Sequence, residues 1–390
     1  MRYKKRIVDL IKIAAGFIIA SFMKLKKDNR NVWLISERRD EAEDNGYHLF
    51  KYIRENHPNE KVYYVIDKSS EGYKRIEQYK NIIDYNSLKH YIYYFLADKH
   101  ISAFQFFGVP DDSFIWKLEE KELISKKKIF IQHGVIQSKL PFLFFSNTKY
   151  TMFACGAKPE FEYIKDNYGY PEGSVKYLGL CRYDNLYNYK EKNQILVMPT
   201  WRKWIGMTNK DSNSEKDISN FIKSEYYNTY KSLLTNKKLN DLLEENNYNL
   251  IFYPHPEMQR FISLFNSESR RIIIANRKEE NLQSLLKESK ILITDYSSVA
   301  FDYGYMKKAL IYYQFDDKRY CREHFESGYF DHKRDGFGPV VKNEDDLLLE
   351  IEKYIKNIGN REMYVERATN FFKLHDNNNC MRHYEAIREL

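Results

Sequence analysis

The sequence has few cysteines, no long uninterrupted apolar run and no recognisable nucleic-acid-binding motif. Its cysteines Cys155, Cys181, Cys321 and Cys380 lie far apart, and none forms a CxxC pair. This spacing argues against a zinc site or a disulfide framework, and it is typical of a reducing compartment. Helix-turn-helix, zinc-finger and RNP signatures are missing too, so nucleic acid is not expected as a partner.

The N-terminal region contains the longest apolar segment, but Asp9 and Lys12 interrupt it before it reaches the roughly 20 residues that a membrane span needs. Basic residues lie on both sides of the apolar stretch 13–23, and no signal-peptide cleavage site is recognised. Basic ends around a short apolar helix are typical of a helix on an anionic membrane surface. Residues 1–26 are therefore predicted to form such a helix. The alternative is an amphipathic helix that packs on the protein itself.

The length and the pattern of the chain favour two α/β domains. A chain of 390 residues exceeds what one compact core usually supports, and its formal net charge of +8 favours an anionic partner. Short apolar runs alternate with helical stretches, which is the pattern of parallel α/β sheets. A polar stretch near residue 190 separates two such series, so the predicted domains are 27–188 and 189–390. The predicted strands include residues 31–36, 62–66, 100–107, 128–132, 195–198, 249–253, 291–294 and 309–313.

Two histidines directly follow predicted strands, where parallel sheets bind their ligands. His133 follows KIFIQ and precedes Gly134, a residue that lets the backbone turn tightly and a substrate approach. An imidazole has a pKa near 6.5, so His133 is a candidate base for an attacking hydroxyl. His255 follows NLIFY between Pro254 and Pro256, which restrict its backbone and suit a residue that meets a phosphate or a leaving group.

The segment ILITDYSSVAFDY carries a candidate phosphate site. Asp295 ends a predicted strand, and Ser297 and Ser298 lie where a helix should begin. The free amides of a first helical turn attract phosphate, although one serine would suffice for a simple helix cap.

Arginines follow two further predicted strands. In PTWR, Arg202 has the fork geometry that binds a pyrophosphate, and Thr200 or Trp201 has the character to line a base or ribose pocket. Arg182 and Asp184 lie near the expected hinge between the halves. They are either cleft residues or a surface ion pair.

These motifs together resemble the CDP-glycerol:poly(glycerophosphate) glycerophosphotransferase family of teichoic acid enzymes. The resemblance covers nearly the whole chain after the basic N-terminus. It rests on DNGYHLF at 44–50, QHG at 132–134, GLCRYDNL at 179–186, PTWR at 199–202, PHP at 254–256 and TDYSSVAFDY at 294–303.

The resemblance implies a GT-B fold, in which two Rossmann-like domains face each other across a cleft, here with an N-terminal amphipathic helix. It implies transfer of glycerol phosphate or ribitol phosphate from CDP-glycerol or CDP-ribitol, without a metal, to a lipid-linked glycan at the cytoplasmic face of the membrane, where the protein is peripheral. The N-terminal domain would hold the acceptor and the C-terminal domain the donor. The implied catalytic residues are His133 and His255, the donor residues Thr200, Arg202, Asp295, Ser297, Ser298 and Asp302, and the acceptor or cleft residues Asp44, Asn45, Gln132, Gly134, Arg182 and Asp184.

Two positions depart from the usual family pattern. Gln132 stands where members often carry tryptophan before HG, and Cys181 replaces the proline of GxPRxD. Two other functions remain open from the residues alone. One is a GT-B glycosyltransferase that uses a nucleotide sugar for a cell-surface polysaccharide, and the other is an inactive partner that recruits a transferase to the membrane. Donor choice distinguishes the first, and retained function after replacement of both histidines distinguishes the second.

Overall fold

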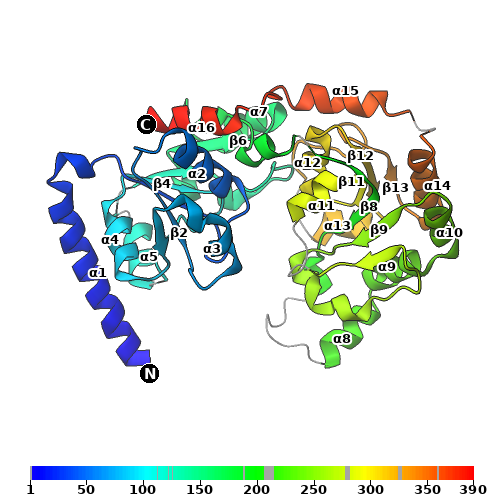
Figure 1. The fold of residues 1–390 in the computed structure, drawn as a ribbon, viewed down its shortest axis with the longest axis horizontal. Helices are drawn as coiled ribbons and strands as arrows, with labels where there is room; N and C mark the ends of the chain where they lie inside the picture. Colours follow the sequence, from blue (N-terminus) through cyan, green and yellow to red (C-terminus); the bar gives the residue numbers. More distant parts are fainter. Residues whose placement is uncertain are drawn as a thin grey trace. The chain divides into compact units, whose positions relative to one another are not determined.

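The computed structural model describes residues 2–111, 113–121, 123–124, 126–187, 189–205, 215–276, 282–323, 327–357 and 360–390. The chain divides into two compact units, each built around a parallel β-sheet (Figure 1). Unit 1 comprises Met1–Val135, Pro141–Asn185 and Leu374–Leu390, and unit 2 comprises Ile136–Leu140 and Leu186–Lys373.

Unit 1 has a seven-stranded sheet in the order β3-β2-β1-β4-β5-β6-β7, in which every paired strand is parallel. The strands are β1 Trp33–Ser36, β2 Val62–Ile66, β3 Ile82–Asp84, β4 Lys99–Ser102, β5 Lys127–Phe130, β6 Met152–Cys155 and β7 Val175–Tyr177. The helices are α1 Arg2–Lys24, α2 Asn45–Asn56, α3 Glu71–Ile76, α4 Leu88–Leu96, α5 Ser113–Glu120, α6 Phe145–Thr148, α7 Lys158–Asn167 and α16 Asn379–Arg388, with short 3-10 turns η1 Lys27–Asn29, η2 Glu77–Tyr79, η3 Pro141–Leu143 and η4 Cys181–Asn185.

Unit 2 has a six-stranded parallel sheet in the order β10-β9-β8-β11-β12-β13. The strands are β8 Lys192–Met198, β9 Asn249–Phe252, β10 Ile272–Ile274, β11 Ser289–Thr294, β12 Ala309–Tyr313 and β13 Val340–Val341. The helices are α8 Glu215–Ile222, α9 Glu225–Thr235, α10 Lys237–Glu245, α11 Leu282–Glu288, α12 Val299–Tyr305, α13 Asp317–Glu323, α14 Glu344–Ile355 and α15 Glu362–Phe371, with 3-10 turns η5 Lys203–Ile205 and η6 Pro256–Leu264.

Both sheets have doubly wound Rossmann topology. In each, the first strand lies inside the sheet, and the chain winds outward first to one side and then to the other. The predicted α/β class with two Rossmann-like domains is confirmed. In such sheets, ligands bind beyond the carboxyl ends of the strands where the winding direction reverses. That switch point lies between β1 and β4 in unit 1, and between β8 and β11 in unit 2.

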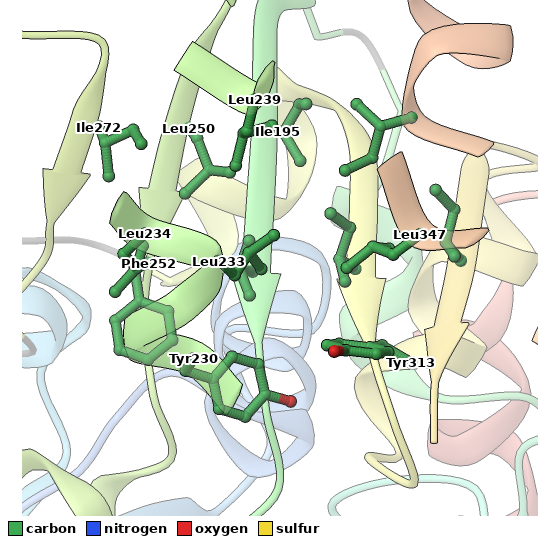
Figure 2. Close-up of a cluster of buried hydrophobic side chains, with 14 of the residues drawn as sticks. Ile195, Tyr230, Leu233, Leu234, Leu239, Leu250, Phe252, Ile272, Tyr313 and Leu347 are labelled. Atoms are coloured by element: carbon green, nitrogen blue, oxygen red, sulfur yellow. The ribbon is translucent and has the colours of Figure 1, made fainter. Parts of the chain in front are cut away.

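The core of unit 2 explains why its strands read as continuous apolar runs. Strands buried on both faces need apolar side chains on both faces. Figure 2 shows Ile195, Leu250 and Ile272 from neighbouring strands, covered by Leu233 and Leu239 from helices α9 and α10. A rigid sheet with buried strand ends fixes where the loops after those strands emerge.

Helix α1 packs on α4 through a narrow face of small and apolar residues (Figure 1). Ile13 and Ala20 are buried there, and a Cβ on Gly16 would lie 2.8 Å from the Cβ of Tyr91, so only glycine allows this approach. The rest of the helix exposes large apolar side chains. The helix therefore packs on the protein itself and also presents an exposed apolar surface, and its position at a membrane stays a prediction. The exposed side chains include Ile7, Ile11, Ile18, Phe22 and the following Leu25.

The C-terminal helix α16 belongs to unit 1, whereas the predicted second domain ran to residue 390. The carboxylate of Asp184 caps its N-terminus by accepting from the backbone N–H groups of Asn379 and Cys380 at 2.9 and 2.7 Å. At its C-terminus, the Lys99 ammonium donates to the carbonyl of Ile387 at 2.7 Å. Because these partners are distant in sequence, the helical pattern alone could not indicate which unit the helix joins.

Candidate active site

The turn after β5 presents His133 at the edge of the unit 1 sheet. Gln132 adopts a left-handed backbone with φ of 57°, so the sharp turn falls two residues before the Gly134 expected to provide it. The Gln132 amide donates from Nε2 to the carbonyl of Ala154 at 2.5 Å. This bond joins the turn to β6 and fixes the direction in which His133 leaves the sheet.

Asp44, Asn45 and Arg182 bind this turn from two other segments. The Asn45 amide donates to the carbonyl of Gln132 at 2.8 Å and accepts from the backbone N–H of Arg182 at 2.9 Å. The Arg182 guanidinium pairs with Asp44 at 3.0 Å and donates to the carbonyl of His133 at 2.5 Å. These bonds join four of the six residues predicted for the acceptor side, namely Asp44, Asn45, Gln132 and Arg182. Gly134 lies next to His133 along the chain and is the fifth.

A buried carboxylate holds the start of α2 in place. Glu37 is 2% exposed and accepts from the backbone N–H groups of Glu43, Asp44 and Tyr47 at 2.7 to 3.2 Å. Burial and the nearby Asp44 carboxylate raise the pKa of Glu37 to about 8, against these stabilising hydrogen bonds. Glu37 therefore sets the position of Asp44, and through it that of Arg182.

His133 is held in its neutral form with one ring nitrogen available as an acceptor. A ring N–H donates to the carbonyl of Ala103, which leaves the other nitrogen without a proton in the neutral imidazole. His133 is exposed to solvent on one side, and the Phe104 ring encloses one face of its imidazole, with the ring centroids 4.9 Å apart. That enclosure, with the positive charges of Arg182 and Arg38, lowers the pKa of His133 to about 4. The group can accept a proton from a hydroxyl at neutral pH.

In unit 2 the switch point is locked by a buried ion-pair cluster. Arg202 has no exposed side-chain surface and pairs with Asp295 at 2.8 Å and with Asp316 at 2.6 Å. Asp295 also accepts from the backbone N–H and the hydroxyl of Thr200, at 2.9 and 2.6 Å. These bonds join the loops after β8, β11 and β12. The guanidinium of Arg202 is thus committed to protein carboxylates and faces no solvent.

The two serines after Asp295 are more accessible. Ser297 and Ser298 are half-buried, and the Ser298 side chain makes no capping hydrogen bond to α12. The Ser297 hydroxyl accepts weakly from the backbone N–H of Val299 at 3.4 Å. Asp302 lies one turn into α12 and is buried, with 3% of its surface exposed. The serines are therefore placed for a ligand, and Asp302 lies behind them.

His255 follows β9 and points its ring in a defined direction. Its Nδ1 accepts from the backbone N–H of Glu257 at 3.2 Å, so the proton of the neutral ring sits on Nε2. The ring lies 6.3 Å from that of Trp201, and the backbone N–H of His255 donates to the carbonyl of Pro199. These contacts bring the PHP and PTWR loops together. The Nε2–H donor belongs to His255, which is half-buried.

Asp184 is not part of either site. Its carboxylate is occupied by the N-terminus of α16, so the expected cleft role is replaced by a helix-capping role. The expected pairing of Arg182 with Asp184 is also replaced, because Arg182 pairs with Asp44.

Sequence reasoning missed Glu37, Phe104 and Asp316. Glu37 and Asp316 closely follow β1 and β12, so the strand-end rule that selected their neighbours would also have selected them. Phe104 follows β4, and its ring stacks on His133 with centroids 4.9 Å apart at 10°. No sequence signal marks an aromatic residue as the partner of a particular histidine.

Two Rossmann-like domains in one chain are the components of a GT-B fold, and comparison with solved structures supports that fold. The wall teichoic acid polymerase TagF matches with a TM-score of 0.65 at 18% identity, covering 100% of this chain and 96% of that one. A UDP-N-acetylglucosamine 2-epimerase from Listeria monocytogenes matches with a TM-score of 0.57 at 13% identity, over 92% of this chain and 96% of the other. These likenesses concern the fold, which enzymes of different activity share.

The chain belongs to the CDP-glycerol:poly(glycerophosphate) glycerophosphotransferase family, whose sequence profile matches residues 17–389. The minor teichoic acid biosynthesis protein GgaB of Bacillus subtilis is 36% identical over 367 residues, 93% of this chain and 40% of GgaB. A teichoic acid glycerol-phosphate transferase of Staphylococcus aureus is 36% identical over 94 residues, 24% of this chain and 23% of that protein. The matches to this chain thus cover less than half the length of each of these relatives.

Proposed function

We propose that this protein transfers glycerol phosphate or ribitol phosphate from a CDP-activated donor to the hydroxyl of a lipid-linked glycan and releases CMP. The observation that carries the proposal is the pair of strand-end sites in a member of this family. Unit 1 presents a neutral imidazole with a free acceptor nitrogen, and unit 2 presents hydroxyl and N–H donors at the switch point of its sheet.

In the proposed reaction, His133 accepts the proton of the acceptor hydroxyl as its oxygen attacks the phosphorus of the donor. The P–O bond to CMP breaks, and CMP leaves with the bonding electron pair. Asn45 and Arg182 hold the backbone on both sides of His133, so they position the base without contacting the reacting atoms. Positioning and charge stabilisation supply most of the rate in phosphoryl transfer.

The donor phosphates are assigned to the exposed edge of the unit 2 switch point. The Ser297 and Ser298 hydroxyls are accessible, and the Nε2–H of His255 is suited to donate to a phosphate oxygen or to the departing CMP. Thr200, Arg202, Asp295 and Asp302 support this edge. Because Arg202 is fully buried between two carboxylates, we assign it to holding the loops and not to direct contact with the pyrophosphate.

The donor polyol and the metal requirement are proposals of finer detail. A poly(ribitol-phosphate) polymerase of Bacillus spizizenii is 37% identical to this chain over 76 residues, which are 19% of this chain and 12% of that protein. Similarity to relatives is therefore compatible with either glycerol phosphate or ribitol phosphate as the transferred group. Transfer is expected to need no metal. Within the residues that the structure describes, no group of three or more His, Cys, Asp or Glu side chains has the geometry to hold an ion.

We further propose that α1 attaches the protein to the cytoplasmic face of the membrane as a peripheral protein. Ile11, Phe22 and their exposed neighbours form an apolar face, and the exposed Lys24, Lys26 and Lys27 follow it. This combination suits an anionic membrane surface. In the described part of the chain, no helix is long and apolar enough to span a bilayer.

Substitution tests this attachment better than truncation, because truncation would also uncover the α4 surface on which Gly16 packs. The double variant Ile11→Glu with Phe22→Glu should lose most of its sedimentation with anionic liposomes. Leu349→Glu, at an exposed leucine on α14, should sediment like the wild type. Equal sedimentation of all three proteins would contradict the attachment.

The experiment for the transferase function is CMP release by the purified full chain with a lipid-linked glycan acceptor. CDP-glycerol, CDP-ribitol and a UDP-sugar are offered separately, each with and without EDTA. Release of CMP from one CDP donor, unchanged by EDTA, is expected and identifies the polyol. Release of UDP alone would move the protein to the nucleotide-sugar transferases, and no release from any donor would favour a binding role.

A further inference from the structure

Three neighbouring strands of unit 1 each contribute one layer to a stack of side chains beside the switch point. Arg38 follows β1, Phe104 follows β4 and His133 follows β5. The Phe104 ring lies parallel to the His133 imidazole, with centroids 4.9 Å apart at 10°. The Arg38 guanidinium carbon lies 4.9 Å from the centroid of the same phenyl ring. Phe104 is therefore in contact with both the proposed base and an arginine.

The two arginines near His133 differ in how firmly protein holds them. The Arg182 side chain is 11% exposed and bonded to Asp44 and to the His133 carbonyl. The Arg38 side chain is 50% exposed, and its ion pair with Glu41, three residues away, is 3.3 Å long. An ion pair whose arginine is half exposed to solvent contributes little to stability. Arg38 can therefore exchange Glu41 for another anion at little cost.

We propose that Arg38 binds a phosphate group of the substrate beside His133, with Phe104 setting the spacing between guanidinium and imidazole. This inference rests on the proposed function and adds a specificity residue to it. A guanidinium presents paired N–H groups that match two oxygens of a phosphate. Stacking on Phe104 orients that fork before the ligand arrives, which lowers the entropy cost of binding.

Binding at Arg38 would also change the proton affinity of His133. The charged groups that face the imidazole are Arg38 from the loop after β1 and Arg182 from η4, and Asp44 at the start of α2 pairs with Arg182. A bound phosphate neutralises Arg38 and leaves Arg182 with its own partner. Protonation of His133 then meets less repulsion, so the base becomes stronger only once a phosphate is seated.

The test is an NMR titration of the His133 imidazole in the full chain, assigned by its loss in His133→Ala. The probes are CDP-glycerol and a short glycerol phosphate oligomer, which separate a donor phosphate from an acceptor phosphate. Arg38→Met removes the charge, and Arg39→Met removes the same charge from the neighbouring exposed position. We expect one probe to shift the His133 signal and raise its pKa in the wild type and in Arg39→Met, but not in Arg38→Met.

A second readout uses kinetics with the substrate that the titration identifies. Arg38→Met should raise the KM of that substrate about 10-fold or more, since hydrogen bonds to charged groups contribute about 1.5 to 3 kcal/mol. Arg38→Lys, which keeps the charge but not the planar fork, should lie between Arg38→Met and the wild type.

Two results of the titration overturn the proposal, namely equal responses of Arg38→Met and the wild type, or no response of the wild type to either probe. Neither depends on turnover, so they remain distinct from a failure of CMP release. Failed CMP release would count against the transferase function itself.

Discussion

The two sheets share one topology, yet their switch points use arginine in opposite ways. In unit 1, Arg38 is half exposed beside His133, and in unit 2, Arg202 is completely buried between Asp295 and Asp316. The first arrangement leaves positive charge available to a ligand. The second uses the charge to join three loops, and leaves serine hydroxyls and His255 as the accessible groups.

The difference shows that burial decides what a strand-end arginine can do. Arg202 lies in the more suggestive motif, but its partners are protein carboxylates. Arg38 lies in an unremarkable loop, but protein holds it only weakly. A buried ion pair is costly to break because one charge would then remain without a partner. We therefore expect residues of unit 1 to carry out the chemical step. In unit 2, we expect the buried ion pairs to hold in place the loops that bind the ligand.

The largest effect is expected from His133→Ala. Loss of a general base usually lowers the rate about 10²- to 10⁴-fold, so CMP release should fall by that factor while the protein stays folded. The control His375→Ala, at an exposed histidine near α16, should keep wild-type activity. If His133→Ala released CMP at a rate within a factor of two of the wild-type rate, His133 would not be the general base.

The next effect concerns stability in unit 2. Arg202→Met leaves Asp295 and Asp316 buried without their cation, which is expected to cost about 3 to 5 kcal/mol of unfolding free energy. Arg271→Met breaks a more exposed pair with Glu244 and should cost at most about 1 kcal/mol. Urea unfolding of the three proteins measures both values. Similar losses of unfolding free energy in the two variants would mean that burial does not determine how much each ion pair contributes to stability.

A smaller loss is expected where Asp184 caps α16. Asp184→Ala should lower stability by about 0.5 to 2 kcal/mol and increase hydrogen exchange in the first turn of α16. Asp166→Ala, at an exposed aspartate on α7, is the matched control. If Asp184→Ala changed KM and left the unfolding free energy unchanged, Asp184 would instead have the cleft role expected from the sequence.

Ser298→Ala tests the accessible edge of unit 2. Removal of one neutral hydrogen bond is worth about 1 kcal/mol, so the KM for the CDP donor should rise about 5-fold. Ser219→Ala, at an exposed serine on α8, should have no effect. Wild-type donor kinetics for Ser298→Ala would count against a phosphate at this edge.

The pH dependence of kcat/KM tests the protonation state of His133 in unit 1. The reaction needs neutral His133, whose pKa is lowered to about 4 by the enclosing protein and then by Arg182 and Arg38. Activity should therefore be kept as pH falls through 6.5 and be lost only toward about pH 4. Arg38→Met removes a charge that opposes protonation, so its acid limb should move to higher pH. An acid limb near 6.5 in the wild type would contradict this environment.

Much of the fold could be predicted from the sequence because parallel strands buried on both faces leave a clear apolar signature. The runs NVWLIS, VYYVI, KIFIQ, ILVM and ILIT all overlap observed strands. The predicted strand at 100–107 was too long, since β4 ends at Ser102 and the following residues form the loop with Phe104. The short strand β13 was missed because Val340–Val341 is too brief to show a period.

For the site, the strand-end rule found His133, His255 and Asp295, but could not assign partners. Arg202 and Arg182 both looked like ligand residues, and only burial and distance distinguish their actual contacts. Asp184 looked like a hinge residue because α16, its partner, lies nearly 200 residues away in sequence. Contacts of that range depend on tertiary packing, which local patterns do not encode.

We propose that unit 1 supplies the general base of the reaction and that unit 2 binds the donor. The most direct measurement is calorimetric binding of CDP-glycerol or CDP-ribitol, whichever supports turnover, to His133→Ala and Ser298→Ala alongside their CMP release. We expect His133→Ala to bind the donor as the wild type does but to turn over at least about 100-fold more slowly, and Ser298→Ala to bind the donor more weakly. Loss of donor binding in His133→Ala, with normal binding in Ser298→Ala, would contradict it.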